Sequence, residues 1–309
     1  MDRCLETYRG MQATQIASLP PSAPVPFEAA HAIALLEQGR VSDAMTMAVR
    51  LLAVEQAPPD PMRGALLEKL RENPFIEMCR SRPMGYAGDP EMLDLALGEA
   101  RVCGVTRCGR DMFNWMVHRS AYFRAVRRRS AYLAEQIDAA AGDHANSSVV
   151  GLFPGYGREL LASRACQSGQ VSARLIAHDG RVLGFARTLH RSDRVSLQTA
   201  SLASVLGGAV RMFDSSLVYA PDLADHLGDD MLAQLLEETV SWLRPGGELV
   251  LPALAASPEH DFLEIAADWR PNSWTAADLM RLVRHLGRVA SWLRHDAANG
   301  IFFLHMQRC

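Results

Sequence analysis

The chain has 309 residues, of which 49% are hydrophobic and 22% charged, and this balance indicates a soluble globular protein of about two domain-sized units. The net charge of −3 gives no overall attraction to nucleic acid, and no apolar run approaches the ~20 residues that a membrane span requires. The N-terminus is too polar for a signal peptide and the six cysteines are scattered, so we expect a reduced, cytoplasmic protein without disulfides or a metal site.

The first part of the chain predicts an arm followed by helices. Residues 1–26 are polar and then rich in Pro and Ser, as in a flexible arm. Apolar residues recur at helical spacing over 27–56, and Gly39 divides them into a helix pair. Further helices are expected at about 62–72, 90–100 and, as one or two long helices, 111–141. We therefore predict a helical N-terminal domain over residues 27–143 that covers a substrate.

Two segments of this domain carry candidate substrate contacts. The loop Arg-Pro-Met-Gly-Tyr-Ala-Gly-Asp, residues 82–89, combines the chemistry and the turn residues of a ligand loop. Asp89 and Pro90 also suit the N-cap and the first position of a helix, and we expect both roles. Five arginines crowd residues 119–129, but no other basic cluster supports a nucleic-acid patch. Most should face water or pair with acids, and one, such as Arg127, could hold an anionic substrate.

From residue 144 to 309 the pattern alternates between strands and helices. Strands are expected at 148–153, 173–178, 195–198, 215–219, 248–251, 289–293 and 300–306. Helices are expected at 158–165, 180–189, 201–206, 229–243, 260–268 and 275–286. A sharp Pro-Gly-Gly turn precedes the fifth strand, and residues 296–300 form a hairpin turn. This order predicts an α/β fold: a Rossmann-like, seven-stranded, doubly wound sheet that ends in an antiparallel hairpin.

The turn after the first strand predicts a nucleotide-type site. Gly155 and Gly157 permit a tight turn with the backbone close to a ligand, and Asp179 at the end of the second strand is placed to accept both hydroxyls of a ribose. A dinucleotide fingerprint needs a third glycine where Leu160 stands, so NAD is disfavoured, and the lack of Gly-Lys-Ser/Thr excludes a P-loop. S-adenosylmethionine, with a ribose but no phosphate, suits this turn best.

Several motifs resemble those of one family. Leu-Arg-Pro-Gly-Gly-Glu-Leu-Val, residues 243–250, looks like the strand-5 signature of class I S-adenosylmethionine-dependent methyltransferases. More narrowly, the chain resembles bacterial methyltransferases of 3-hydroxypalmitic acid methyl ester (quorum-sensing signal) biosynthesis. Four segments over about residues 60–309 carry this resemblance: the loop 82–89, the arginine helix 125–129, the strand-4 segment 213–227 and Asp268-Trp269.

The resemblance implies S-adenosyl-L-methionine as cofactor, bound by Gly151, Phe153, Gly155, Gly157, Asp179, Gly180, Ser201 and Tyr219. It implies methylation of a carboxylate on a small or fatty-acid-like substrate, with Arg82 and Tyr86 orienting the carboxylate. Tyr86, Asp89, Arg127 and Trp269 would contact the substrate. A hydroxyl or amine acceptor would instead need a base, for which His226 and His178 are the candidates.

The chain also departs from the family pattern. The acid of the first strand is replaced by Gly151, and the first glycine of the turn is replaced by Phe153. After the third strand, the acid expected to face the adenine appears as Thr-Ala-Ser, residues 199–201. These departures motivate an alternative, a methyltransferase-like protein that serves as a non-methylating binding or scaffold protein or catalyses another reaction. A hydrolase lacks support because the chain has no Gly-x-Ser-x-Gly elbow. The oligomeric state stays open, with a homodimer among the alternatives.

Overall fold

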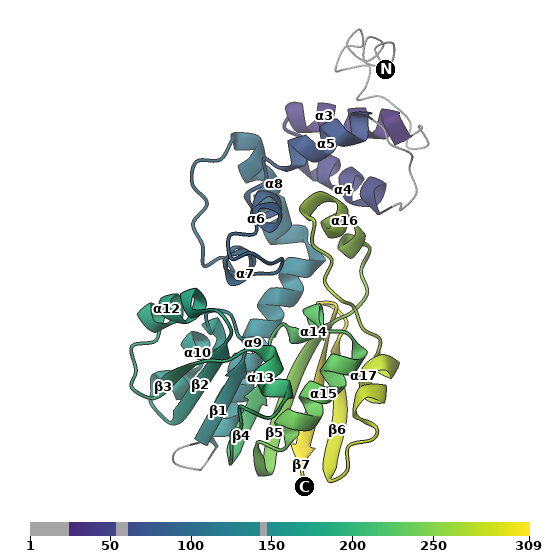
Figure 1. Ribbon diagram of the computed structural model, residues 1–309. Coiled ribbons are helices and arrows are strands. Elements are labelled where there is room, and N and C mark those ends of the chain that lie inside the picture. The colour runs from purple at the N-terminus through teal and green to yellow at the C-terminus, as the bar shows by residue number, and fades with distance from the viewer. Residues whose placement is uncertain (1–24, 54–60, 143–146) are drawn as a thin grey trace. The chain divides into compact units, whose positions relative to one another are not determined.

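The computed structural model describes residues 25–53, 61–142 and 147–309, which form two compact units (Figure 1). Unit 1 comprises the described residues up to Arg124 together with Ser257–Arg270, and unit 2 comprises Ala125–Ala256 and Pro271–Cys309. The division falls inside helix α9 (Ala121–Ala141). The predicted domain boundary at 143/144 stays a prediction, and the predicted arm lies outside the described residues up to residue 24.

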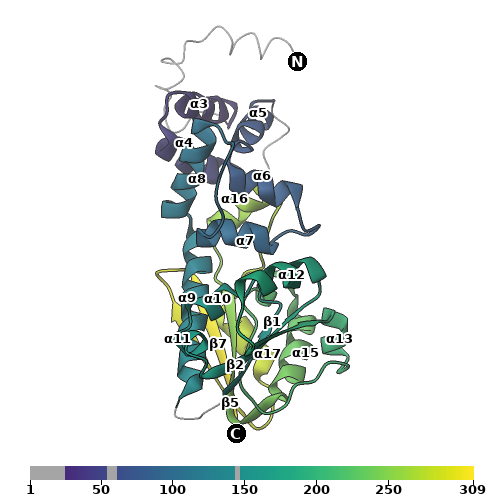
Figure 2. The same ribbon diagram turned by 90° about the vertical axis from the view of Figure 1, so that its left-hand side faces the viewer.

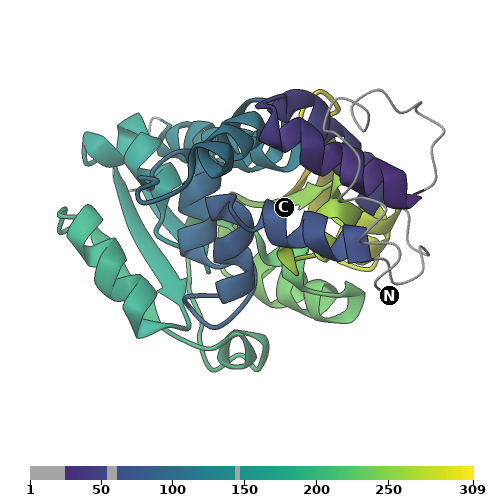
Figure 3. The ribbon, with the colours of Figure 1, turned by 90° about the horizontal axis from the view of Figure 1, so that it is seen from above.

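Unit 1 is helical. Its helices are α3 (Val25–Glu37), α4 (Val41–Leu52), α5 (Pro61–Leu70), α6 (Pro74–Ser81), α7 (Pro90–Leu97), α8 (Arg107–Arg119) and α16 (Pro258–Ala267). The predicted helix pair is confirmed, because Gly39 lies between α3 and α4 with a φ of +75°. Helix α3 packs against α4 and α5 (Figure 3). Buried apolar side chains hold the unit together, with the rings of Phe75 and Phe123 meeting edge to face at 4.7 Å.

Unit 2 contains the predicted seven-stranded sheet, and the strand order is β3-β2-β1-β4-β5-β7-β6. Its strands are β1 (Ser147–Leu152), β2 (Val171–Ala177), β3 (Val195–Thr199), β4 (Ser215–Tyr219), β5 (Leu243–Leu254), β6 (Val289–Asp296) and β7 (Ile301–Arg308). All neighbours pair in parallel except β7, which is antiparallel to β5 and β6. The hairpin turn is confirmed by the hydrogen bond from Asn299 N to Asp296 O.

Helices cover both faces of this sheet (Figure 2). They are α9, α10 (Arg158–Ala162), α11 (Arg164–Gln167), α12 (Gly180–Leu189), α13 (Leu202–Leu206), α14 (Leu223–His226), α15 (Asp229–Val240) and α17 (Ala276–Val283). On β7, Phe302 and Leu304 join the apolar core that α15 and α17 cover, whereas the Phe303 ring packs on Tyr132 of α9. Because both faces of the sheet are covered, the residues of β1 and β4 are buried along nearly the whole strand rather than alternately.

Several predicted boundaries are wrong for local reasons. The helix predicted over 158–165 is broken at Ser163, whose side chain caps α11 through Cys166 N and hydrogen-bonds Asp138. The Pro-Gly-Gly turn does not precede β5 but lies inside it as an irregularity, because Gly247 lets the backbone approach Ser215 O. The helices predicted over 229–243 and 275–286 end earlier, at Val240 and Val283.

Candidate functional site

The strand order of unit 2 reverses beside β1, which has β2 on one side and β4 on the other. In open α/β sheets, ligands bind outside the carboxyl ends of the strands at such a switch point. The segments that leave β1, β2 and β4 therefore define the candidate site. Predicted residues of unit 2 that lie on these segments include Gly155 and Gly157, Asp179 and Tyr219.

The turn after β1 keeps a glycine-type backbone although one glycine is missing. Phe153, Gly155 and Gly157 have φ angles of +49°, +56° and +70°. The left-handed conformation costs a non-glycine residue about 1–2 kcal/mol, so Phe153 is held there under strain. The hydrogen bond from Phe153 N to Ile176 O, at 2.7 Å, fixes the turn to β2. The half-buried ring packs on the apolar core, with its centroid 6.0 Å from that of His178.

Gly157 is required by its neighbours. A Cβ atom at this position would lie 2.6 Å from Leu175 Cδ1 and 3.0 Å from His190 Nε2. The His190 ring is buried, and Nε2 lies 2.8 Å from Tyr156 O. Burial lowers the pKa of His190, so the ring is neutral and donates from Nε2 to this carbonyl. The His190 side chain, through its hydrogen bond to Tyr156 O, therefore fixes the turn.

At the end of β1, Gly151 provides space that Tyr219 fills. The two residues are register partners on β1 and β4. A Cβ on Gly151 would lie only 2.6 Å from Tyr219 Oη and 2.8 Å from Cζ. The phenol therefore occupies the volume into which a strand-1 side chain would project. This is the position where the resemblance led us to expect an acid.

The Tyr219 hydroxyl donates a hydrogen bond of 2.6 Å to Glu159 Oε1, and both side chains are buried. Glu159 lies on α10, two positions after Gly157. Burial raises the pKa of Glu159 to about 7, although the hydrogen bond from Tyr219 acts in the opposite direction. The turn thus carries a carboxyl group that changes its charge near neutral pH.

A second acidic group follows β4. Asp225 Oδ2 accepts from Arg129 of α9 at 2.7 Å in an ion pair whose side chains are 1% and 3% exposed. Asp225 Oδ1 is buried and has no hydrogen-bond partner among the described residues. Burial raises the pKa of Asp222, which interacts electrostatically with His226, Arg129, Asp225 and Glu159. We call Glu159, Asp222, Asp225 and Arg129 the buried charge cluster.

Asp179 lies at the predicted place after β2. Its side chain accepts from Arg181 N at 2.8 Å as the N-cap of α12, and pairs with the Arg181 guanidinium at 2.6 Å. Hydrogen bonds from Arg181 lower the pKa of Asp179, so it is ionised at neutral pH. Gly180 is the exposed first residue of α12, and Ser201 caps α13 through Ser204 N.

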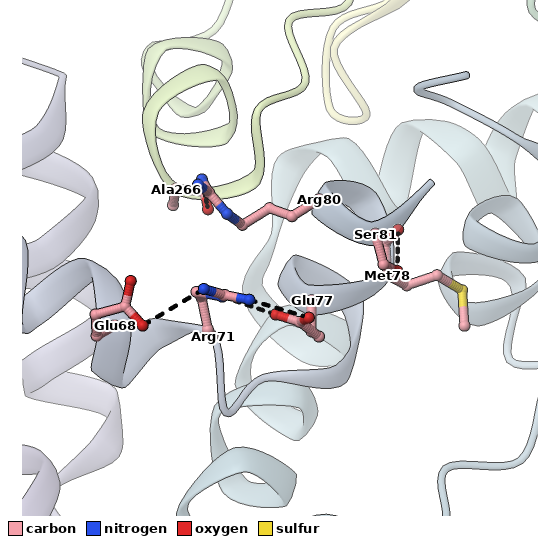
Figure 4. Close-up of polar contacts among 7 residues, drawn as sticks. All are labelled: Glu68, Arg71, Glu77, Met78, Arg80, Ser81 and Ala266. Atoms are coloured by element: carbon pink, nitrogen blue, oxygen red, sulfur yellow. Dashed lines mark hydrogen bonds and ion pairs between the residues drawn. The ribbon is translucent and has the colours of Figure 1, made fainter. Parts of the chain in front are cut away.

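The predicted residues of the 82–89 loop belong to unit 1. Arg82 pairs with Asp268 at 2.5 Å, and both residues end their helices in left-handed conformation. Asp89 is buried and accepts from Met84 N and Met92 N, so it closes the loop and caps α7 as predicted. Figure 4 shows that Arg80, near the end of α6, also donates to Ala266 O of α16. The segment before the loop is fixed too, by the ion pair of Arg71 with Glu77.

The remaining predicted side chains differ in exposure. Tyr86 is half-buried and Trp269 is buried, both in unit 1. In unit 2, Arg127 is half-buried, whereas His226 and His178 are exposed. The predicted contacts of these side chains with a ligand stay predictions.

Sequence reasoning missed the buried charge cluster. Its members come from α9, from α10 and from the segment after β4, and the sequence gives no spacing rule that joins them. Asp225 and Arg129 lay inside segments quoted for the family resemblance, but neither was selected as a site residue. Gly151 was the signal that could have found this cluster. Because the first strand lacks the expected acid, a carboxylate from another element was to be looked for near the turn.

Comparison with known proteins supports the fold. No protein-family model matches the chain, and no curated protein matches it. Among solved structures, a possible exported protein from Bordetella parapertussis is similar over 87% of this chain and 96% of its own, with a TM-score of 0.63 and 16% identity. A Thermobifida fusca protein provisionally assigned as a methyltransferase is similar over 70% and 92%, with a TM-score of 0.51 and 13% identity.

The chain has the class I methyltransferase fold. Identities of this size show the architecture alone, so the cofactor and the substrate must be argued from the residues. In the described part of the chain, no helix is both long and apolar enough to cross a membrane.

Proposed function

We propose that the protein binds S-adenosylmethionine at the switch point beside β1 and transfers its methyl group to a substrate. The observation that carries this proposal is the turn after β1, which keeps three left-handed residues although one is phenylalanine. A strained backbone is retained where the surrounding structure and function require it. Asp179, ionised at the end of the adjacent β2, supports the proposal because a ribose needs such an acceptor.

The residues present fit the adenosine and the amino-acid end of this cofactor in different ways. Asp179 is 14% exposed and would have to share its oxygens between Arg181 and the ribose hydroxyls. The methionine end meets no acid on β1, where Gly151 stands. The Phe153 ring is half-buried against the apolar core, where the family turn has a glycine. The ribose end therefore meets an acceptor, and the amino-acid end must be held by a residue outside β1.

We further propose a carboxylate as the methyl acceptor, a choice that rests on the family resemblance. S-adenosylmethionine supplies an electrophilic methyl on sulfur, and when a carboxylate oxygen takes it, the electrons of the broken C–S bond stay on sulfur and no proton moves. The protein then needs to orient the acceptor and exclude water. Arg82 is 40% exposed, and an acceptor carboxylate would replace Asp268 on its guanidinium.

The direct test is calorimetric titration of S-adenosylmethionine and S-adenosylhomocysteine. Asp179→Ala should weaken binding at least tenfold. Asp179→Ser should do the same, although serine keeps the N-cap of α12, so loss of the cap is separated from loss of the carboxylate. Asp193→Ala is the matched control and should bind as wild type does. Asp193 is an exposed acid just before β3, at the edge of the sheet opposite to Asp179. Absence of binding heat with wild-type protein at high ligand concentration would reject the proposal.

The acceptor is tested by turnover. Purified protein should form S-adenosylhomocysteine with hydroxy fatty acids or other carboxylic acids, and Arg82→Gln should raise the KM for the acid. Arg107→Gln is the control, because Arg107 is an almost fully exposed arginine of the same unit. Turnover with hydroxyl or amine compounds only would reject the carboxylate and favour a base such as His226.

A second function is favoured by one pair of observations. Gly151 and Phe153 replace the acid and the first glycine of the family turn, and the phenol of Tyr219 fills the vacated side-chain space. These changes suit a methyltransferase-like protein that binds a ligand or a partner without methyl transfer. Mass spectrometry of the purified protein separates the two functions, because retained cofactor or its demethylated product supports the enzyme.

A further inference from the structure

The cofactor of the proposed function carries an α-ammonium group, which requires an acceptor in the protein. Strand β1 contains no Asp or Glu. An acid at Gly151 is also excluded sterically, since its Cβ would overlap the Tyr219 hydroxyl at 2.6 Å. Tyr219 itself is fully buried and is held by its hydrogen bond to Glu159. The acceptor must therefore come from another element.

Glu159 is the carboxylate that the hydrogen bond from Tyr219 holds beside Gly151. It lies on the first turn of α10, directly after the β1 turn, and the Tyr219 hydroxyl from the last residue of β4 holds its Oε1. The pair thus joins the two segments that flank the switch point. A hydrogen bond to the ionised form of a carboxyl group keeps it in one orientation and favours its charge.

The charges around Glu159 favour a cationic ligand. In the described part of the chain, the buried charge cluster contains three carboxyl groups but a single guanidinium, Arg129 is paired with Asp225, and the exposed imidazole of His226 acts on Asp222. The Asp225 side chain is 1% exposed, and its Oδ1 lacks a hydrogen-bond partner among the described residues. A carboxyl oxygen without a donor is costly in a buried site, and an ammonium group would supply the missing donor.

We propose that Glu159, positioned by the Tyr219 hydroxyl, accepts the α-ammonium group of S-adenosylmethionine and S-adenosylhomocysteine in place of a strand-1 acid. This inference rests on the proposed function, because it names the residue that serves one end of the same cofactor. It also explains the Gly151 replacement, since glycine is what admits the tyrosine that holds the glutamate.

Binding of the ammonium group would also change the protonation of Glu159. The titratable and charged groups around Glu159 are Tyr219 of β4, Asp222 after β4, Arg129 of α9 and Cys166 of α11. Burial raises the pKa of Cys166 and of Tyr219, so neither is ionised at pH 7. Only the ionised form of Glu159 pairs with an ammonium group. Protein molecules in which Glu159 is protonated therefore release this proton when the ligand binds.

The experiment compares two ligands that differ in the amino acid. S-adenosylhomocysteine carries the ammonium group, whereas 5′-methylthioadenosine has the same adenosine and sulfur without it. Dissociation constants are measured for wild type, for Glu159→Gln and for Glu237→Gln, an exposed glutamate of α15 that serves as the control. Wild type and the control should bind S-adenosylhomocysteine more tightly than 5′-methylthioadenosine. In Glu159→Gln the ratio of the two dissociation constants should fall at least tenfold, while the affinity for 5′-methylthioadenosine stays unchanged.

The pH profile gives an independent readout. The affinity of wild type for S-adenosylhomocysteine should rise between pH 6 and pH 8, and that of Glu159→Gln should not. Tyr219→Phe, which keeps the ring and removes the hydroxyl, should lose part of the preference and supplies a second variant if Glu159→Gln fails to fold.

The outcomes are distinguishable. Wild type that binds neither ligand contradicts the proposed function itself. Wild type that binds both ligands equally, or variants at Glu159 and Tyr219 that keep the wild-type preference, would leave the cofactor site standing but overturn the role of Glu159.

Discussion

Replacing Glu159 by glutamine should change how the stability of unit 2 depends on pH. The carboxyl group has an ordinary pKa of 4.5 and a pKa of about 7 in the folded protein, because it is buried. The glutamine side chain would keep an oxygen that can accept from the Tyr219 hydroxyl, so the substitution removes the titration and keeps the shape.

The sign follows from which state holds the proton. Below pH 4.5 both states are protonated, and Glu159 costs nothing. Between pH 4.5 and pH 7 the unfolded chain loses this proton before the folded protein does, so the free energy of unfolding falls as the pH rises. Above pH 7 the full difference applies. The difference between 4.5 and about 7 in the pKa of this carboxyl group corresponds to about 3 kcal/mol.

The measurement is urea unfolding at several pH values, followed by fluorescence of the buried Trp242 and Trp274. The free energy of unfolding of Glu159→Gln, relative to wild type, should rise by about 2.5 kcal/mol from pH 5 to pH 8. Glu237→Gln, on an exposed face of α15, should show a constant difference. A constant difference for Glu159→Gln as well would refute the assignment of a buried, titrating carboxyl group to this position.

Other substitutions test the same site by stability. Gly151→Ala should cost about 1–3 kcal/mol because its Cβ meets the Tyr219 hydroxyl, and less in a Tyr219→Phe background; additive effects in the double-mutant cycle would contradict the overlap. Phe153→Gly should be more stable than Phe153→Ala by about 1 kcal/mol, since alanine keeps the left-handed strain; equal midpoints in urea would count against that strain. Arg129→Met should cost about 3–5 kcal/mol by leaving Asp225 buried without its partner, and an effect below about 1 kcal/mol would show that the pair is not closed in solution.

Local signals were sufficient for much of the fold. Apolar periodicity gave the elements of unit 2, and the alternation of strands and helices allowed few sheet orders, so the antiparallel hairpin at the end was predictable. Helix capping was also predictable, because it depends on residues next to each other in the sequence, such as Asp89 and Pro90 at the start of α7. The boundaries of the elements were harder to predict, because they depend on contacts between residues far apart in the sequence. Ser163 contacts Asp138, and Gly247 approaches Ser215.

The sequence by itself determined the architecture and the place of the turn, because periodicity and glycine spacing are local properties of a chain. It could show that the strand-1 acid was missing, but not what replaced it. The Tyr219 hydroxyl, Glu159, Asp225 and Arg129 come together only when β1, β4, α9 and α10 pack at the switch point. Charge and burial are properties of that packing, and for this reason only the tertiary structure decided which carboxyl group stands beside the turn.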